Sequence, residues 1–284
     1  MDSINYVPNG GLAATLNANI HGNGTQTLVL SYGYGLDQNV WHLLLPYLVC
    51  CFKVLTFDLA FSPNVTPDFY KPDKYSTLHG YSQDLVNLLD ELQLKNTVYL
   101  GHSMSAMIGA IAATERPDLF QHLILLSGSP RYLNDSGYYG GSEMPQLNTL
   151  FHTMEKNYSN WVRNFAPAAV TVSDKAAVAE FEQSLGRMNP KVAVDVAKAV
   201  FLGDLRRVLP EVTVPCSVIQ SREDLFVPEF VGHYMQKNLG GAAKVQFLKA
   251  QGHFPQLTAH RLLLKALKKL HLISGIKKCS PSLL

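Results

Sequence analysis

Apolar positions along the chain fall into short β-branched runs that alternate with longer segments of helical periodicity. Buried strands are predicted at residues 27–31, 53–58, 97–100 and 123–126. Helices are predicted between them at residues 41–48 and 75–94, the second with leucines along one face. Alternating strands and helices are typical of a mainly parallel sheet with helices on both faces, so we predict an α/β fold.

The alternation stops between residues 137 and 207, where helical segments follow one another without a strand. These helices are predicted at residues 143–157, 159–165, 175–187 and 190–201. Strand character returns in the apolar runs that precede Asp224 and His253. A helical insertion of this kind predicts a lid over the sheet. We expect a core at residues 1–136 and 208–274, a lid at residues 137–207 and a disordered tail at residues 275–284.

The pattern that carries chemistry is Gly-His-Ser-Met-Ser at residues 101–105, directly after a predicted strand. A strand that ends in such small residues and passes into a helix is typical of a nucleophile elbow. The tight turn lifts the Ser103 hydroxyl clear of the sheet and sets it at a helix N-terminus, which favours developing negative charge. Short Gly/Ser strings also occur in ordinary loops, and the alternative is a serine that only caps the helix.

Two further residues complete a catalytic pattern, because Asp224 and His253 each follow a predicted strand. The chain order Ser, Asp, His is that of α/β-hydrolases and differs from the orders in chymotrypsin and subtilisin. We predict that His253 takes the proton of Ser103 and that Asp224 fixes the tautomer of His253. Glu223 competes for the acid role, but the context Asp-x-x-Val-Pro favours Asp224.

Acyl transfer also needs two N–H donors for the oxyanion. We predict the backbone of Met104, which follows the nucleophile, and of Tyr34 in the Gly-rich loop after the strand at residues 27–31. His102 is interpreted as a packed core residue. The lid carries six aromatic candidates for a pocket wall, namely Phe151, Tyr158, Trp161, Phe165, Phe181 and Phe201, of which two or three are expected to face a ligand. The predicted substrate-binding residues are Tyr34, Trp161, Phe165, Phe201 and Phe254.

Composition narrows the functional classes. A chain of 284 residues with 47% hydrophobic content can form one large α/β domain. The net charge of +2 and the lack of a basic stripe argue against nucleic-acid binding. We expect no membrane segment, no secretory signal and, from four cysteines without a framework pattern, a reducing intracellular compartment. Residues 33–35 lack the third glycine of a dinucleotide fingerprint, and no cofactor is expected.

Six collinear segments resemble the plant strigolactone and karrikin receptor–hydrolases, a DWARF14-like family to which the bacterial stress regulator RsbQ is related. These segments are residues 34–41, 101–109, 116–120, 129–132, 214–216 and 252–257. The resemblance covers residues 19–270, and residues 57–62 and 252–258 are most similar to the branch called DWARF14-like two.

The resemblance implies an α/β-hydrolase core with a four-helix, V-shaped lid and a triad of Ser103, His253 and Asp224. It implies an enol-ether-linked butenolide as the substrate, whose ring Ser103 or His253 would attack or trap, with slow turnover that accompanies signalling. The implied protein partners are an F-box leucine-rich-repeat protein and a Clp-ATPase-like repressor. A monomer in the cytoplasm and nucleus is expected.

Four departures from the family pattern bear on the site. Tyr32 stands where the family has His, which could disturb the oxyanion loop, and Tyr34 stands where it has Phe, which adds a hydroxyl that needs a partner. Ser142 replaces Phe and would remove an apolar wall, and residues 59–63 replace Asn-Met-Gly-Ala-Gly.

Three functional hypotheses therefore stay open. The first is a slow esterase for butenolides or small esters, which rests on the complete Ser103, His253 and Asp224 set. The second is a ligand-binding signalling module with little or no turnover, which rests on the altered oxyanion loop. The third is an α/β-hydrolase of unrelated chemistry, such as a perhydrolase, in which Met after the serine is also common.

Overall fold

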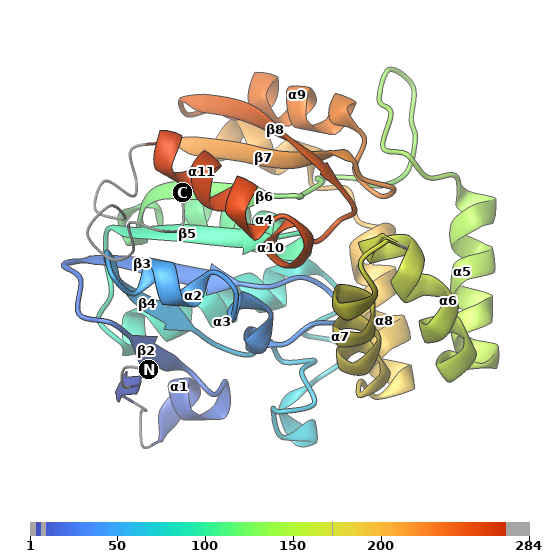
Figure 1. Cartoon of the computed structure of the whole chain (residues 1–284), viewed down its shortest axis with the longest axis horizontal. Helices are drawn as coiled ribbons and strands as arrows, with labels where there is room; N and C mark the ends of the chain where they lie inside the picture. Colours follow the sequence, from blue (N-terminus) through green and yellow to red (C-terminus); the bar gives the residue numbers. More distant parts are fainter. Residues whose placement is uncertain (1–3, 7–9, 172, 271–284) are drawn as a thin grey trace.

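The computed structural model describes residues 4–6, 10–171 and 173–270 (Figure 1). The tail predicted at residues 275–284 lies outside the described residues. An eight-stranded sheet crosses the molecule in the order β1-β2-β4-β3-β5-β6-β7-β8. The strands are β1 (Ile4–Tyr6), β2 (Asn19–His21), β3 (Gln26–Ser31), β4 (Phe52–Thr56), β5 (Thr97–His102), β6 (Phe120–Leu126), β7 (Cys216–Glu223) and β8 (Ala243–Gln251). The pairs β1–β2 and β2–β4 are antiparallel and the other pairs are parallel, so the predicted α/β class is confirmed.

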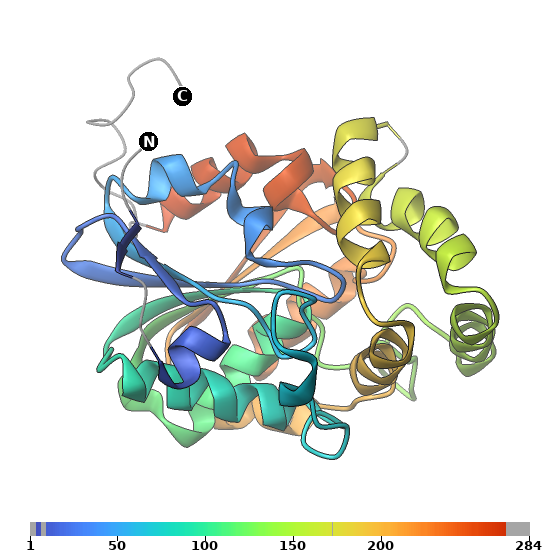
Figure 2. The same cartoon turned by 90° about the horizontal axis from the view of Figure 1, so that it is seen from below.

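Helices cover both faces of this sheet (Figure 2). One face carries α2 (Leu45–Leu48), α10 (Pro255–Thr258) and α11 (His260–Lys269), and the other carries α1 (Gly11–Thr15), α3 (Leu78–Glu91), α4 (Met104–Glu115) and α9 (Glu229–Asn238). Short 3-10 turns complete the core as η1 (Gln38–Trp41), η2 (Pro67–Phe69), η3 (Pro117–Leu119) and η4 (Arg206–Glu211). Within the described residues, no helix combines the length and apolar character that crossing a membrane requires.

The centre of the sheet is built for close packing between β5 and α4. Every residue of β5 is buried, and α4 is buried from Met104 to Ala113. Gly109 lets the helix approach the strand, because a Cβ there would lie 2.2 Å from Cε1 of Tyr99. Because β3, β5, β7 and β8 run parallel, the loops that follow them lie at one edge of the sheet. This edge is where α/β sheets bind their ligands.

Four helices lie beside that edge, at the right of Figure 1: α5 (Met144–Lys156), α6 (Tyr158–Val170), α7 (Lys175–Gly186) and α8 (Pro190–Phe201). They are inserted between β6 and β7, and each corresponds to one predicted helical segment. The domain boundaries at residues 136/137 and 207/208 stay a prediction. An ion pair between Asp37 of the core and Arg187, which follows α7, joins the two parts.

Two helices that contain proline differ from their predicted bounds. Of the segment predicted as one helix at residues 41–48, only Leu45–Leu48 is α-helix, since η1 ends at Trp41 and a turn follows it. Pro46 lies in the first turn of α2, where its missing N–H is not needed. Helix α6 passes Pro167 and ends at Val170 instead of Phe165. That extension brings the end of α6 to the loop that holds His253, since the His253 N–H donates to Ala169 O over 2.9 Å.

Candidate active site

The turn between β5 and α4 holds Ser103 in a strained conformation. Its φ and ψ are 57° and −123°, a sparsely populated region that costs on the order of 1–3 kcal/mol and that clusters at functional sites. Small neighbours make the turn possible. A Cβ on Gly101 would lie 2.3 Å from Ser105 O, and a Cβ on Gly33 would lie 2.7 Å from Ser103 Cβ. This geometry is that of a nucleophile elbow rather than of a capping serine, since Ser103 makes no side-chain cap bond.

The structure brings Ser103, His253 and Asp224 into one hydrogen-bonded chain. His253 Nε2 lies 2.8 Å from Ser103 Oγ, and His253 Nδ1 lies 2.8 Å from Asp224 Oδ2. The Asp224 side chain is fully shielded from solvent. Its other oxygen, Oδ1, accepts the backbone N–H groups of Phe226 and Val227 over 2.9 and 3.2 Å, which fixes the carboxylate.

The competing carboxylate, Glu223, lies elsewhere. It is exposed, and its Oε2 accepts a hydrogen bond of 2.6 Å from Gln251 Nε2. Asp224 rather than Glu223 therefore contacts His253.

The two predicted oxyanion donors flank the nucleophile. Met104 begins α4 directly after Ser103, and Tyr34 follows Gly33, which itself lies against Ser103. In the described part of the chain, neither amide N–H has a hydrogen-bond acceptor. Among the described residues, neither N–H group thus has a competing backbone acceptor, and their role as oxyanion donors stays a prediction.

Tyr32 is accommodated beneath this loop. Its fully buried hydroxyl donates to Asp58 Oδ1 over 3.1 Å and accepts the Leu59 N–H over 2.7 Å. Ser105, where an elbow usually has glycine, donates from its hydroxyl to the backbone carbonyl of Tyr32. The larger side chain is therefore held by partners of its own, and its effect on the oxyanion loop stays a prediction.

The other departures also have local explanations. The Tyr34 hydroxyl donates to Ala193 O in α8 over 3.1 Å, so it has the partner that a buried hydroxyl needs, and burial raises the pKa of Tyr34. Ser142 pairs through its backbone with Tyr132 and does not line the cavity above Ser103. The expectation that the exchange of Phe for Ser142 removes an apolar wall stays a prediction.

A small aromatic cavity of about 20 Å³ lies over the Ser103 hydroxyl. This volume is enough for about one water molecule. The lining residues include Tyr34, Tyr132, Phe165, Phe181, Phe201, Phe226 and Phe254. Four of the five predicted substrate-binding residues thus line the cavity.

Trp161 is the exception, and its predicted contact with a ligand is not supported. It lies behind Phe165, with the two rings stacked at 4.6 Å between centroids, and does not reach the cavity wall. Three of the six aromatic lid candidates line the cavity, which agrees with the expected number. They are Phe165, Phe181 and Phe201, so Phe181 rather than Trp161 is the third. Phe226 and Tyr132 were missed by sequence reasoning. The sequence did offer one signal for Phe226, because it lies two residues after the predicted catalytic residue Asp224.

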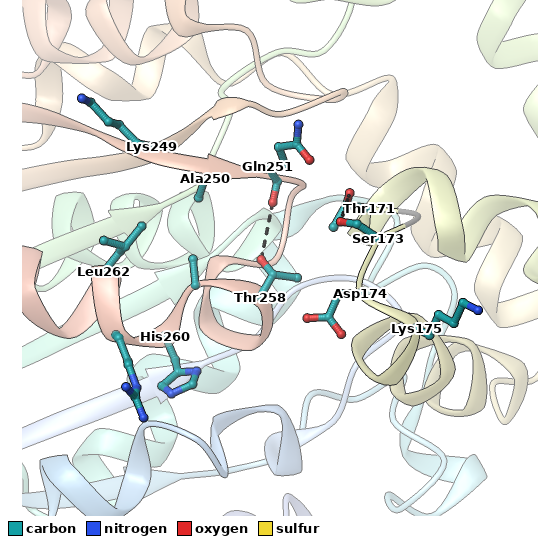
Figure 3. A pocket seen from close by; sticks show the side chains of 12 residues that line it. Thr171, Ser173, Asp174, Lys175, Lys249, Ala250, Gln251, Thr258, His260 and Leu262 are labelled. Carbon is teal, nitrogen blue, oxygen red and sulfur yellow. Dashed lines mark hydrogen bonds between the residues drawn. The ribbon is translucent and has the colours of Figure 1, made fainter. Parts of the chain in front are cut away.

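A groove much larger than this cavity is lined by other residues. It has a volume of about 770 Å³ and separates the α6–α7 connection from the end of β8 and the start of α11 (Figure 3). Polar side chains such as Asp174, Lys175 and His260 line it, and Ser103, Asp224 and His253 do not. Among the described residues, no group of three potential ligands is placed to hold a metal ion.

Comparison with known proteins agrees with this geometry. Residues 20–266 match the model of the alpha/beta hydrolase family. The chain is 44% identical to the karrikin insensitive 2 receptor CA of Petunia hybrida over 252 residues, covering 88% of this chain and 93% of the relative. It is also 44% identical to the strigolactone esterase D14 of Arabidopsis thaliana, over 89% of this chain and 95% of the relative.

Among solved structures, a hydrolase from Oleispira antarctica superposes with a TM-score of 0.89 at 32% identity, covering 93% of this chain and 96% of that one. The family match and the identity to curated relatives both span most of the sequence. The chain therefore belongs to the alpha/beta hydrolase family, in the group that includes the karrikin receptors and strigolactone esterases.

Proposed function

We propose that this protein is a serine esterase that cleaves small butenolide-containing ligands by acyl transfer to Ser103. The observation that carries the proposal is the continuous chain from Ser103 Oγ through His253 to Asp224, with both contacts at 2.8 Å. The ligand class is supported by relatives that are named as a strigolactone esterase and as karrikin receptors.

The reaction follows from the positions of these groups. Ser103 Oγ attacks the carbonyl carbon of the ester while His253 Nε2 takes the hydroxyl proton. The negative oxygen of the tetrahedral intermediate accepts from the N–H groups of Tyr34 and Met104. The bond between the carbonyl carbon and its alkoxy oxygen, which in a butenolide is the ring oxygen, breaks as His253 returns the proton to that oxygen. A water molecule, deprotonated by His253, then releases the acyl group from Ser103.

The size of the cavity limits how a ligand enters. Ligand pockets usually measure about 300–1,000 Å³, far more than the cavity of about 20 Å³ over Ser103. Binding therefore requires the aromatic wall or the lid to move. A step of this kind makes slow turnover the expected behaviour, because opening limits access to the nucleophile.

The test is hydrolysis of a fluorogenic butenolide ester by the unsubstituted protein and by Ser103→Ala. We expect the substitution to remove turnover. Ser173→Ala is the matched control, since Ser173 is exposed on the groove of Figure 3 and does not line the cavity over Ser103. Equal turnover by the unsubstituted protein and Ser103→Ala would contradict the proposal. Activity that depends on added peroxide would instead support the perhydrolase hypothesis.

A second function, ligand-dependent signalling with little turnover, is favoured by the contact between the site and the lid. The His253 N–H donates to Ala169 O of α6, so the backbone of His253 is in direct contact with a lid helix. We propose an F-box leucine-rich-repeat protein and a Clp-ATPase-like repressor as partners of a monomer in the cytoplasm and nucleus. Co-precipitation with and without the butenolide tests the partners, and a fluorescent fusion tests the location.

A further inference from the structure

The residue before the nucleophile, His102, contacts the residue that is proposed as the base. His102 is fully buried at the end of β5, and its Nε2 lies 2.8 Å from the backbone carbonyl oxygen of His253. The two imidazole rings lie 5.1 Å apart, and the His102 ring lies 5.3 Å from that of Phe254. His102 therefore touches the backbone of His253, whereas Ser103 and Asp224 touch its side chain.

The partner of His102 determines its protonation. A carbonyl oxygen can only accept, so Nε2 must carry a proton and act as the donor. Burial and the neighbouring His253 lower the pKa of His102 well below its usual range, so the ring is neutral with Nδ1 unprotonated. Nδ1 has no partner among the described residues and lies beside Gly33, where a Cβ would approach it to 2.8 Å. His102 is thus a donor whose protonation stays the same across the pH range in which esterases work.

The backbone of His253 is held on both sides. His102 donates to its carbonyl oxygen, and its N–H donates to Ala169 O at the end of α6 over 2.9 Å. With the backbone held, the imidazole reaches Ser103 and Asp224 at 2.8 Å each. Positioning of a base to this accuracy matters, since a misplacement of about 1 Å can cost roughly 100-fold in rate.

We propose that His102 is a positioning residue for His253, which it holds in place through the Nε2–H donor to the His253 carbonyl. This inference rests on the proposed esterase function. The alternative is that His102 only fills space in the core, in which case the hydrogen bond contributes to stability but not to the alignment of His253.

Two substitutions separate these possibilities. His102→Leu fills similar volume without a donor, and His102→Gln retains an N–H donor on a side chain of comparable reach. For His102→Leu we expect kcat to fall about 10- to 100-fold with little change in KM, because the base is misaligned while the cavity is retained. His102→Gln should recover most of that loss. His79→Leu, at an exposed position of α3, is the control.

The outcome is read on folded protein, with the melting temperature of each variant measured alongside. Comparable kcat values for His102→Leu and the unsubstituted protein would overturn the proposal, and so would equal losses in the Leu and Gln variants. A second measurement does not need turnover. The downfield proton resonance of the hydrogen bond between His253 and Asp224 should be sharp in the unsubstituted protein and in His102→Gln, and broadened in His102→Leu. If the unsubstituted protein shows no serine-dependent turnover, the esterase proposal fails while this resonance still decides the role of His102.

Discussion

Asp224 Oδ2 lies 2.8 Å from His253 Nδ1, and the second oxygen of the same carboxylate accepts two backbone N–H groups, from Phe226 and Val227. These bonds leave the carboxylate one orientation, in which it accepts a hydrogen bond from the Nδ1–H of His253 and leaves Nε2 free to accept from Ser103. The loop after β7 therefore sets the tautomer of the base.

Asp224→Asn is the direct test of that tautomer. The amide can present its N–H to Nδ1, which would place the proton of His253 on Nε2 and prevent it from accepting from Ser103. We expect kcat for a butenolide ester to fall by about 10⁴-fold, the loss known for such a change in a serine protease triad. Steady-state kinetics with the melting temperature measured in parallel provide the check.

Glu223→Gln serves as the control for this change. Glu223 is the adjacent carboxylate, is exposed and contacts Gln251 rather than His253. Its substitution should leave kcat close to that of the unsubstituted protein. A larger loss from Glu223→Gln than from Asp224→Asn would exchange the roles of the two carboxylates.

Local pattern was sufficient to predict six of the eight described strands, all but β1 and β2, and three of the residues in contact at the site. Ser103, Asp224 and His253 each follow an apolar run, and parallel strands end at one edge, so the three could be placed together without a structure. The aromatic wall could not be predicted in the same way. Trp161 and Phe165 lie four residues apart on one helix, and which of them faces the cavity depends on how α6 rotates against the core.

The same limit applies to Phe226 and Tyr32. Phe226 meets Phe165 at 5.4 Å between ring centroids, a contact between residues 61 positions apart that no local pattern predicts. The buried hydroxyl of Tyr32 finds its hydrogen-bond partners in Asp58 and the Leu59 N–H, which the pairing of β3 with β4 brings close to it. The surroundings of Phe226 and of Tyr32 therefore depend on packing between segments that are far apart in the sequence.

Phe226 is expected to control the size of ligand that reaches Ser103. Its ring lies between solvent and the cavity, in contact with Phe165 and with the His253 ring at 5.4 Å. Phe226→Ala removes the ring but keeps the backbone N–H that binds Asp224. We expect kcat/KM for bulky butenolide esters to rise at least several-fold relative to the smallest ester. Kinetics on a series of esters of increasing size measure this ratio.

Leu225→Ala is the matched control, because the Leu225 side chain is 64% exposed on the same loop. It should leave the ratio between large and small esters unchanged. If Phe226→Ala changes the rates for all esters by the same factor, Phe226 does not select by size.

Tyr32→Phe should lower the unfolding free energy rather than the rate of turnover. The change removes the hydroxyl that serves the Asp58 carboxylate and the Leu59 N–H, and both groups are buried. Loss of a buried partner costs about 1–3 kcal/mol of unfolding free energy. Chemical denaturation measures this cost, and Tyr139→Phe, whose side chain is 55% exposed, should show almost none. A large fall in kcat with unchanged stability would instead place Tyr32 in the oxyanion machinery.

Gly252 permits the contact between the His253 loop and the lid, and its substitution should affect stability and turnover together. Its φ is +84°, and a Cβ at this position would lie 1.6 Å from Val170 O at the end of α6. Gly137 has a similar φ of +72° but open space within 4 Å, so Gly137→Ala isolates the backbone cost, about 1–2 kcal/mol. Gly252→Ala should carry the same backbone cost and, in addition, push α6 away from the His253 loop, which would break the hydrogen bond from the His253 N–H to Ala169 O. We expect Gly252→Ala to lower the unfolding free energy clearly more than Gly137→Ala does. The fraction of Gly252→Ala that folds should have lost most of its turnover. Equal losses in the two variants would show that the lid can withdraw from the His253 loop without cost.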